Sequence, residues 1–187
     1  MNPLLAAAGE VQEHCLAHDL KLCFIGGLAV LRWGEPRLTR DVDLTVISLP
    51  GNEQTAVDAL LERFTSRIAD ARAFALANRV LLLRAANGVP LDIALGALDF
   101  ELRAVERATP WVVDTQSLLT CSAEDLIIFK VFAGRDRDWL DVESVVIRQG
   151  SSLDCALIYS ELEQLLPLKG STDDLARIGK LLGQAPR

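Results

Sequence analysis

Two aspartates, Asp41 and Asp43, lie two residues apart in the otherwise apolar segment DVDLTVIS at residues 41–48. The β-branched residues of this segment predict a strand, and side chains two apart along a strand point to the same face. Two carboxylates on one face repel each other, and their burial is costly unless a cation lies between them. Because Mg²⁺ prefers oxygen ligands, the segment predicts a strand that presents two acids to a magnesium ion.

A third acid, Asp92, lies inside the apolar segment VPLDIAL. An Asn-Gly dipeptide separates this segment from another apolar run, and that arrangement is a strong hairpin signal. We expect strands at about 79–86 and 89–95. If the second strand lies beside residues 41–47, three carboxylates converge. Such a cluster can hold one or two Mg²⁺ for phosphoryl or nucleotidyl transfer.

Gly26 and Gly27 follow a short predicted strand at residues 21–25 and precede a short helix that ends at Gly34. Glycines at a helix start allow close approach to free backbone N–H groups, which favours phosphate binding. A nucleoside triphosphate with Mg²⁺ would engage both the glycines and the acids. Each feature alone also has a structural interpretation, in which the glycines form a turn and the acids are solvated.

The order Gly26-Gly27, then Asp41-Val42-Asp43, then Asp92 resembles the motif of the DNA polymerase β nucleotidyltransferase superfamily. The resemblance implies an α/β fold: a nucleotidyltransferase core with a mixed β-sheet flanked by helices, followed by a small C-terminal helical region. It implies that Asp41 and Asp43 bind the nucleotide metal and that Asp92 completes a second metal site. Gly26 and Gly27 would bind phosphate. Arg40 directly precedes Asp41, and from this position we expect it to contact the nucleotide.

The sequence favours a mixed α/β structure first and helices only afterwards, with the change at about residues 110–120. Residues 122–134 predict a helix with Ser122 as its N-cap and Gly134 as its stop. A second helix follows, and two more are expected at 153–166 and 172–183. We therefore expect a nucleotidyltransferase core at 1–115 and a helical region at 116–187 packed on it.

The segment SAEDLIIFKVFAGRDRDWLDVESVV resembles the C-terminal motifs of AbiEii-like nucleotidyltransferases, which are toxins of bacterial abortive-infection systems. The resemblance implies that Lys130 contacts the nucleotide phosphates, that Asp138 is needed for activity, and that an antitoxin protein is a partner. A cation in an apolar helix requires an anion, and pairing of Lys130 with Asp138 or Asp141 is the alternative. The matching positions are Glu124, Asp125, Lys130, Arg135, Arg137, Asp138 and Asp141.

The chain of 187 residues has a formal net charge of −7, which gives it no general attraction for nucleic acid. Arg37, Arg40 and Arg84 either form a local positive rim or pair with nearby acids. The four cysteines form no CxxC pair, so we expect reduced core residues and no disulfides in a cytoplasmic protein. No apolar run is long enough to span a membrane.

These observations predict a Mg²⁺-dependent nucleotidyltransferase that moves NMP from an NTP to a hydroxyl acceptor. The catalytic acids would be Asp41, Asp43, Asp92 and Asp138. The acceptor, whether tRNA, protein or small molecule, stays open. The alternatives are a catalytically inactive nucleotide-binding or protein-interaction module with the same fold, and a purely structural protein in which each acid has a protein partner.

Overall fold

The computed structural model describes residues 2–47, 51–171 and 173–183. These residues form two compact units, which are described separately. Unit 1 comprises Met1–Leu28 and Leu38–Cys121, and unit 2 comprises Ala29–Arg37 and Ser122–Arg187. Helix α2 (Gly26–Trp33) begins in unit 1 and continues into unit 2.

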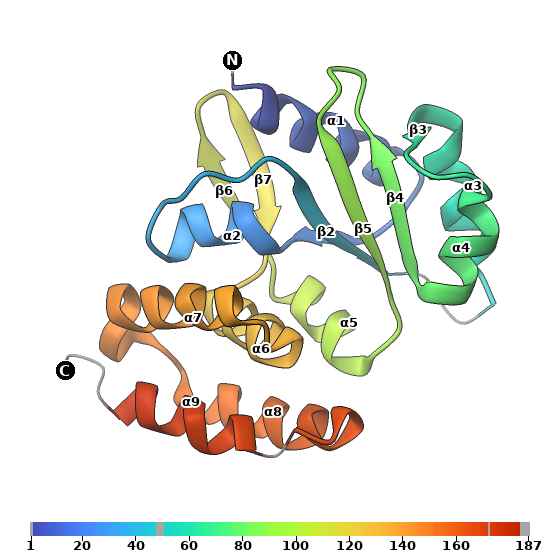
Figure 1. Ribbon diagram of the computed structural model, residues 1–187. Helices are drawn as coiled ribbons and strands as arrows, with labels where there is room; N and C mark the ends of the chain where they lie inside the picture. The colour runs from blue at the N-terminus through green and yellow to red at the C-terminus, as the bar shows by residue number, and fades with distance from the viewer. Residues whose placement is uncertain (1, 48–50, 172, 184–187) are drawn as a thin grey trace. The chain divides into compact units, whose positions relative to one another are not determined.

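Unit 1 is built on a mixed sheet with the strand order β3-β4-β5-β2-β1-β7-β6 (Figure 1). Helix α1 packs against β7 and α3, and α5 packs against β1 and β2. Its strands are β1 (Leu22–Phe24), β2 (Val42–Ile47), β3 (Thr65–Ser66), β4 (Val80–Arg84), β5 (Pro90–Gly96), β6 (Thr109–Val113) and β7 (Gln116–Thr120). Its complete helices are α1 (Pro3–Ala17), α3 (Glu53–Arg63), α4 (Ala71–Asn78) and α5 (Asp99–Glu106).

Strand β2 lies at the centre of this sheet and decides where the acids lie. It pairs antiparallel with β1 and parallel with β5, while β4 and β5 form the expected antiparallel hairpin. The apolar side chains of β2, namely Val42, Leu44 and Val46, are fully buried. Apolar burial on alternate positions fixes the register, so the acids between them share the opposite face.

The sequence pattern misses several elements of unit 1. The helix expected over 53–68 ends at Arg63, because Phe64 adopts an extended conformation and the chain enters β3. Helices α4 and α5 and strands β6 and β7 were not expected. Strand β6 is an edge strand whose Val112 is 76% exposed, so it has no clear alternation of apolar and polar residues.

Unit 2 contains the four helices that the sequence predicts. Ser122 caps α6 by accepting a hydrogen bond from the Asp125 N–H, and Gly134 ends this helix at φ 69°. Unit 1 extends to Cys121, because β7 belongs to the sheet, and the chain re-enters unit 2 at Ser122. The helices are α6 (Ala123–Ala133), α7 (Asp136–Gln149), α8 (Cys155–Lys169) and α9 (Asp173–Gly183), with the 3-10 turn η1 (Gly150–Ser152) between α7 and α8.

The four cysteines carry free thiols, and Cys15, Cys23 and Cys121 are buried. Burial raises the pKa of the Cys15 thiol to about 12. Within the described residues, none of the helices has the length and apolar character that crossing a bilayer requires.

Candidate metal centre

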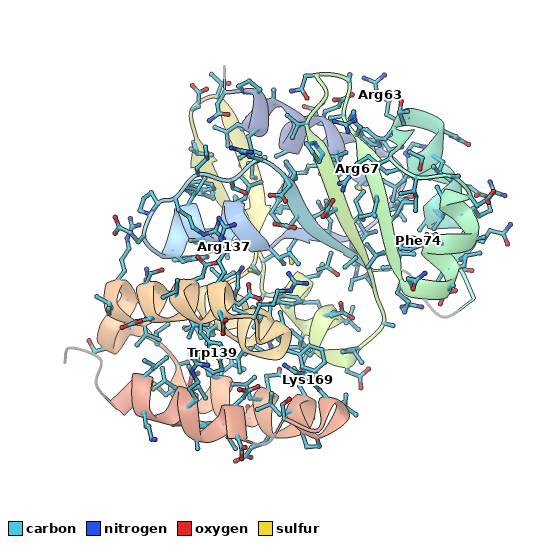
Figure 2. The ribbon with its side chains drawn as sticks, in the orientation of Figure 1. Arg63, Arg67, Phe74, Arg137, Trp139 and Lys169 are labelled. Atoms are coloured by element: carbon cyan, nitrogen blue, oxygen red, sulfur yellow. The ribbon has the colours of Figure 1, made fainter. Side chains whose placement is uncertain are left out.

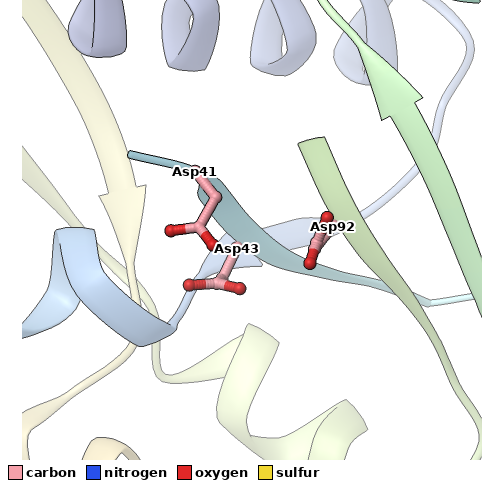
Figure 3. A group of neighbouring side chains, drawn as sticks. All are labelled: Asp41, Asp43 and Asp92. Carbon is pink, nitrogen blue, oxygen red and sulfur yellow. The ribbon is translucent and has the colours of Figure 1, made fainter. Parts of the chain in front are cut away.

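Asp41, Asp43 and Asp92 converge in unit 1. One carboxylate oxygen from each lies within 4.8 Å of the others, and all three side chains are partly buried. Figure 3 shows Asp41 and Asp43 at the start of β2 and Asp92 on the neighbouring β5. The structure thus brings together the three acids that the sequence singled out.

The two glycines that begin α2 lie close to Asp43. Gly26 has φ +54°, and a Cβ on it would lie 2.0 Å from Asp43 Oδ2. The Gly27 N–H donates a hydrogen bond of 3.3 Å to the same oxygen, and the Ile25 N–H donates to the Asp43 carbonyl. A glycine is therefore required at residue 26 for close packing against the Asp43 carboxylate, independently of any contact with a phosphate.

Asp41 is oriented by Thr39. The Thr39 hydroxyl donates to Asp41 Oδ1 at 3.0 Å. A Cβ on Gly27 would lie 2.3 Å from Thr39 Oγ1, so the second glycine leaves the space that Thr39 occupies. Sequence reasoning missed Thr39, although its position two residues before Asp41 is that of a side chain able to reach the acid.

Asp92 has a cationic neighbour that the sequence did not reveal. Arg67, which is labelled in Figure 2, donates from Nη1 to Asp92 Oδ1 in an ion pair within unit 1. Arg67 follows the two-residue strand β3, which has no periodic pattern of its own. No local signal connects Arg67 with Asp92, because their proximity depends on the pairing of β3, β4 and β5.

The donor set fits a hard divalent cation. Mg²⁺ binds oxygen ligands octahedrally at about 2.0–2.1 Å, so opposite ligands are about 4.2 Å apart. Adjacent ligands are about 3 Å apart, so three oxygens within 4.8 Å of one another are near enough to share one ion once the carboxylates move closer to it. Mn²⁺ takes the same carboxylate oxygens and is a suitable probe.

Lys130 and Asp138 lie in unit 2, where they belong to a buried ion-pair network. Lys130 Nζ is 2.7 Å from Asp138 Oδ1 and 2.9 Å from Asp141 Oδ2. Arg37 completes the network with a bidentate pair to Asp141, at 2.6 and 2.7 Å. This is the pairing that the sequence left as the alternative for Lys130. The phosphate contact of Lys130 and the catalytic role of Asp138 stay predictions.

The network controls the ionisation of Asp141. Burial by itself raises the pKa of this carboxyl, but hydrogen bonds from Arg37 and Lys130 and their positive charges lower it by more. The pKa of Asp141 is therefore below its ordinary value, and the acid is ionised at neutral pH.

The arginines considered for a positive rim lie in different settings. Arg37 pairs with Asp141 in unit 2. Arg84 donates to the Gly88 carbonyl in the β4–β5 turn. Arg40 is exposed in unit 1, immediately before Asp41, and its assignment to the nucleotide stays a prediction.

Solved structures of known proteins share this fold. An antigenic nucleotidyltransferase-like protein from Paracoccidioides brasiliensis aligns with 94% of this chain over 93% of its own, at 16% identity and a TM-score of 0.51. The antibiotic-resistance factor ANT(2'')-Ia aligns with 90% of this chain over 94% of its own, at 16% identity and a TM-score of 0.55. Its complex with adenylyl-2''-tobramycin aligns with 86% of this chain over 97% of its own, at 15% identity and a TM-score of 0.56.

These likenesses show a nucleotidyltransferase fold, with the mixed sheet and flanking helices that the sequence predicts. Comparison with curated proteins finds no significant match. A sequence profile of one family matches residues 3–166, which is most of the chain. The chain belongs to this family, whose description is "Nucleotidyltransferase of unknown function (DUF6036)".

Proposed function

We propose that this protein is a Mg²⁺-dependent enzyme that transfers NMP from an NTP to a hydroxyl acceptor and releases pyrophosphate. The observation that carries the proposal is the convergence of Asp41, Asp43 and Asp92 in a chain with a nucleotidyltransferase fold. Three acids within 4.8 Å of one another repel, and a divalent cation offsets this repulsion.

In this proposal Asp41 and Asp43 hold the nucleotide metal, and Asp92 completes a second metal site. Bound metal would lower the pKa of the acceptor hydroxyl and neutralise charge on the leaving pyrophosphate. Gly26 and Gly27 place the N-terminal end of α2 directly against Asp43 and Thr39, and a phosphate group on the bound metal is proposed to meet the backbone N–H groups of this helix end.

Two further roles, those of Lys130 and Asp138, rest on the sequence resemblance alone, and that of Arg40 rests on its position next to Asp41. Arg40 and Lys130 are proposed to contact the nucleotide, and Asp138 is proposed to be needed for activity. Each is tested by a conservative variant: Arg40→Gln, Lys130→Gln and Asp138→Asn. We expect Arg40→Gln and Lys130→Gln to lose nucleotide affinity. We expect Asp138→Asn to lose turnover while it keeps its nucleotide affinity.

The acceptor is proposed to be a hydroxyl compound, with tRNA, protein and small molecules as the classes to compare. ANT(2'')-Ia, which shares the fold, has been solved with adenylyl-2''-tobramycin. A net charge of −7 favours small or cationic acceptors over a polynucleotide, since polynucleotide binding depends on Lys and Arg.

A cytoplasmic toxin of a bacterial abortive-infection or toxin-antitoxin system is the more specific form of the proposal. Its support is the AbiEii-like arrangement of Lys130, Asp138 and Asp141 in the sequence. Expression of the chain alone should slow bacterial growth, Asp43→Ala should relieve this, and an antitoxin partner should also relieve it. Equal growth with wild type and Asp43→Ala would refute the toxin role.

The experiment that tests the enzyme is calorimetric titration of Mg²⁺ and each NTP into the wild type and Asp41→Asn/Asp43→Asn, with pyrophosphate release measured in parallel. Asp19→Asn/Asp114→Asn is a charge-matched control, because both acids are exposed and have positive φ, which asparagine tolerates. Binding and turnover lost only in the first variant would support the proposal. Binding without pyrophosphate release would favour the inactive module.

A further inference from the structure

Arg67 places a positive charge on one of the three acids of the metal centre. Its guanidinium donates to Asp92 Oδ1, while the Asp92 carboxylate also supplies an oxygen to the cluster with Asp41 and Asp43. A hydrogen bond from a guanidinium occupies one of the lone pairs of the carboxylate, and the positive charge of the guanidinium repels a metal ion that approaches the same group. Arg67 therefore acts on the part of the site that the second metal would use.

The backbone holds Arg67 opposite Asp92. The Arg67 N–H donates to the Leu82 carbonyl at 3.0 Å, and Leu82 is the cross-strand partner of Asp92 in the β4–β5 hairpin. The following turn is fixed by Ser66, whose hydroxyl bonds the Ile68 carbonyl and N–H. The backbone pairing of this part of the sheet therefore positions Arg67 next to Asp92.

Folding stability does not account for this pair. The Arg67 and Asp92 side chains are 26% and 35% exposed, and ion pairs with this access to solvent contribute little to stability. A partly exposed pair is also easily exchanged, because water and ions reach both partners. These properties suit a contact that forms and opens during the function of the site.

We propose that Arg67 is a built-in competitor for metal at Asp92: its guanidinium neutralises this acid until a divalent cation displaces it. This inference rests on the proposed function. It implies that a first metal ion binds to Asp41 and Asp43. A metal ion that uses Asp92 binds at higher metal concentration, because Arg67 lowers the affinity of this acid for metal. Arg67 is a regulatory and positioning residue here, not a catalytic one.

Mn²⁺ binding tests the competition directly and needs no turnover. Free Mn²⁺ is measured by its paramagnetic resonance signal during titration of the wild type, Arg67→Gln and Arg72→Gln. Arg72→Gln is the matched control, because it removes the same charge from an exposed pair with Asp58 in the same unit. Circular dichroism verifies that each variant is folded.

Removal of a unit positive charge a few ångströms from a divalent cation should tighten binding roughly fivefold to tenfold in a solvated site with salt. Arg67→Gln should show this gain, and Arg72→Gln should stay within about twofold of the wild type. In the wild type, the Arg67 side-chain Nε–H resonance should shift as Mg²⁺ saturates the site.

Unchanged or weaker Mn²⁺ binding by Arg67→Gln would overturn the competition, as would an Arg67 resonance that does not respond to Mg²⁺. This failure is distinct from failure of the proposed function. If the wild type binds Mn²⁺ and Asp41→Asn/Asp43→Asn does not, the metal centre stands even when Arg67 has no effect. If the wild type binds no Mn²⁺, both proposals fall.

Discussion

Asp43 on β2 and Asp92 on β5 are direct partners across two parallel strands. Partners in this register project their side chains to the same face of the sheet. A slip of one residue would turn Asp92 away and bring Leu91 or Ile93 to its place. The geometry of the metal centre therefore depends on the β2–β5 register, which the buried apolar residues of both strands fix.

The first prediction concerns Gly26. Gly26→Ala adds a Cβ that would lie 2.0 Å from Asp43 Oδ2, at a residue with φ +54°. The carboxylate must move, so we expect loss of metal-dependent nucleotide binding together with a destabilisation of about 1–2 kcal/mol from the left-handed backbone. Calorimetric titration and thermal unfolding measure the two effects.

Gly88→Ala is the control for Gly26→Ala. Gly88 also has a positive φ, of +88°, but a Cβ there meets nothing within 4 Å. Gly88→Ala should therefore be destabilised by backbone strain but should keep normal metal-dependent nucleotide binding. Equal binding by the two variants would contradict the role assigned to Gly26.

The second prediction concerns the hydroxyl that orients Asp41. Thr39→Val removes the 3.0 Å hydrogen bond to Asp41 Oδ1 while keeping the shape of the side chain. We expect Mn²⁺ affinity to fall about fivefold, since one such hydrogen bond contributes about 1 kcal/mol. Thr39→Ser, which keeps the hydroxyl, should restore the affinity. Unchanged Mn²⁺ affinity in Thr39→Val would contradict the role assigned to the hydroxyl, and weak binding by Thr39→Ser as well would mean that the methyl group is also needed.

The third prediction concerns the buried network of unit 2. Asp141→Asn leaves Arg37 and Lys130 without their shared carboxylate, which is almost fully buried. Loss of one partner from a buried network costs about 3 kcal/mol, measured by denaturant unfolding. Asp174→Asn is the control, because its pair with Lys169 at 3.7 Å is more exposed and should contribute less than about 1 kcal/mol.

The same variant gives a prediction for pH dependence. Folding lowers the pKa of Asp141 below its ordinary value of 3.8. A lowered pKa stabilises the fold above the ordinary value, and this stabilisation is lost as pH falls through the folded value. The difference in unfolding free energy between wild type and Asp141→Asn should be constant down to about pH 4 and shrink below it. A constant difference at lower pH would show that Asp141 does not titrate with the network.

The fourth prediction concerns thiol reactivity. Cys15 is buried with a pKa of about 12, and Cys23 and Cys121 are also buried, whereas Cys155 is partly exposed. A thiolate is the reactive form of cysteine. Alkylation near neutral pH, followed by mass spectrometry, should modify Cys155 and reach the other three only after unfolding. Rapid modification of Cys15 in the native protein would contradict its burial.

The sequence indicated the elements with strong local signals. The apolar frame of Asp41 and Asp43 predicted β2, the Asn-Gly dipeptide predicted the β4–β5 hairpin, and Ser122 and Gly134 marked the ends of α6. Each of these signals acts within a few residues of the element it defines.

Other features had no such local signal. Strands β6 and β7 lie at one end of the sheet, and β6, with no fully buried residue, has a pattern that resembles that of a loop. Helices α4 and α5 are short, and their stability comes mostly from tertiary packing. These elements exist because the completed sheet gives them a surface to pack against.

The sequence by itself determined that three acids stand in apolar strands beside two glycines, because periodicity and composition are local properties of the chain. Tertiary structure decided which groups touch those acids. Thr39 reaches Asp41, Gly26 makes room for Asp43, and Arg67 pairs with Asp92. Arg67 and Asp92 lie far apart along the chain, and only strand pairing between β3, β4 and β5 brings their charges together.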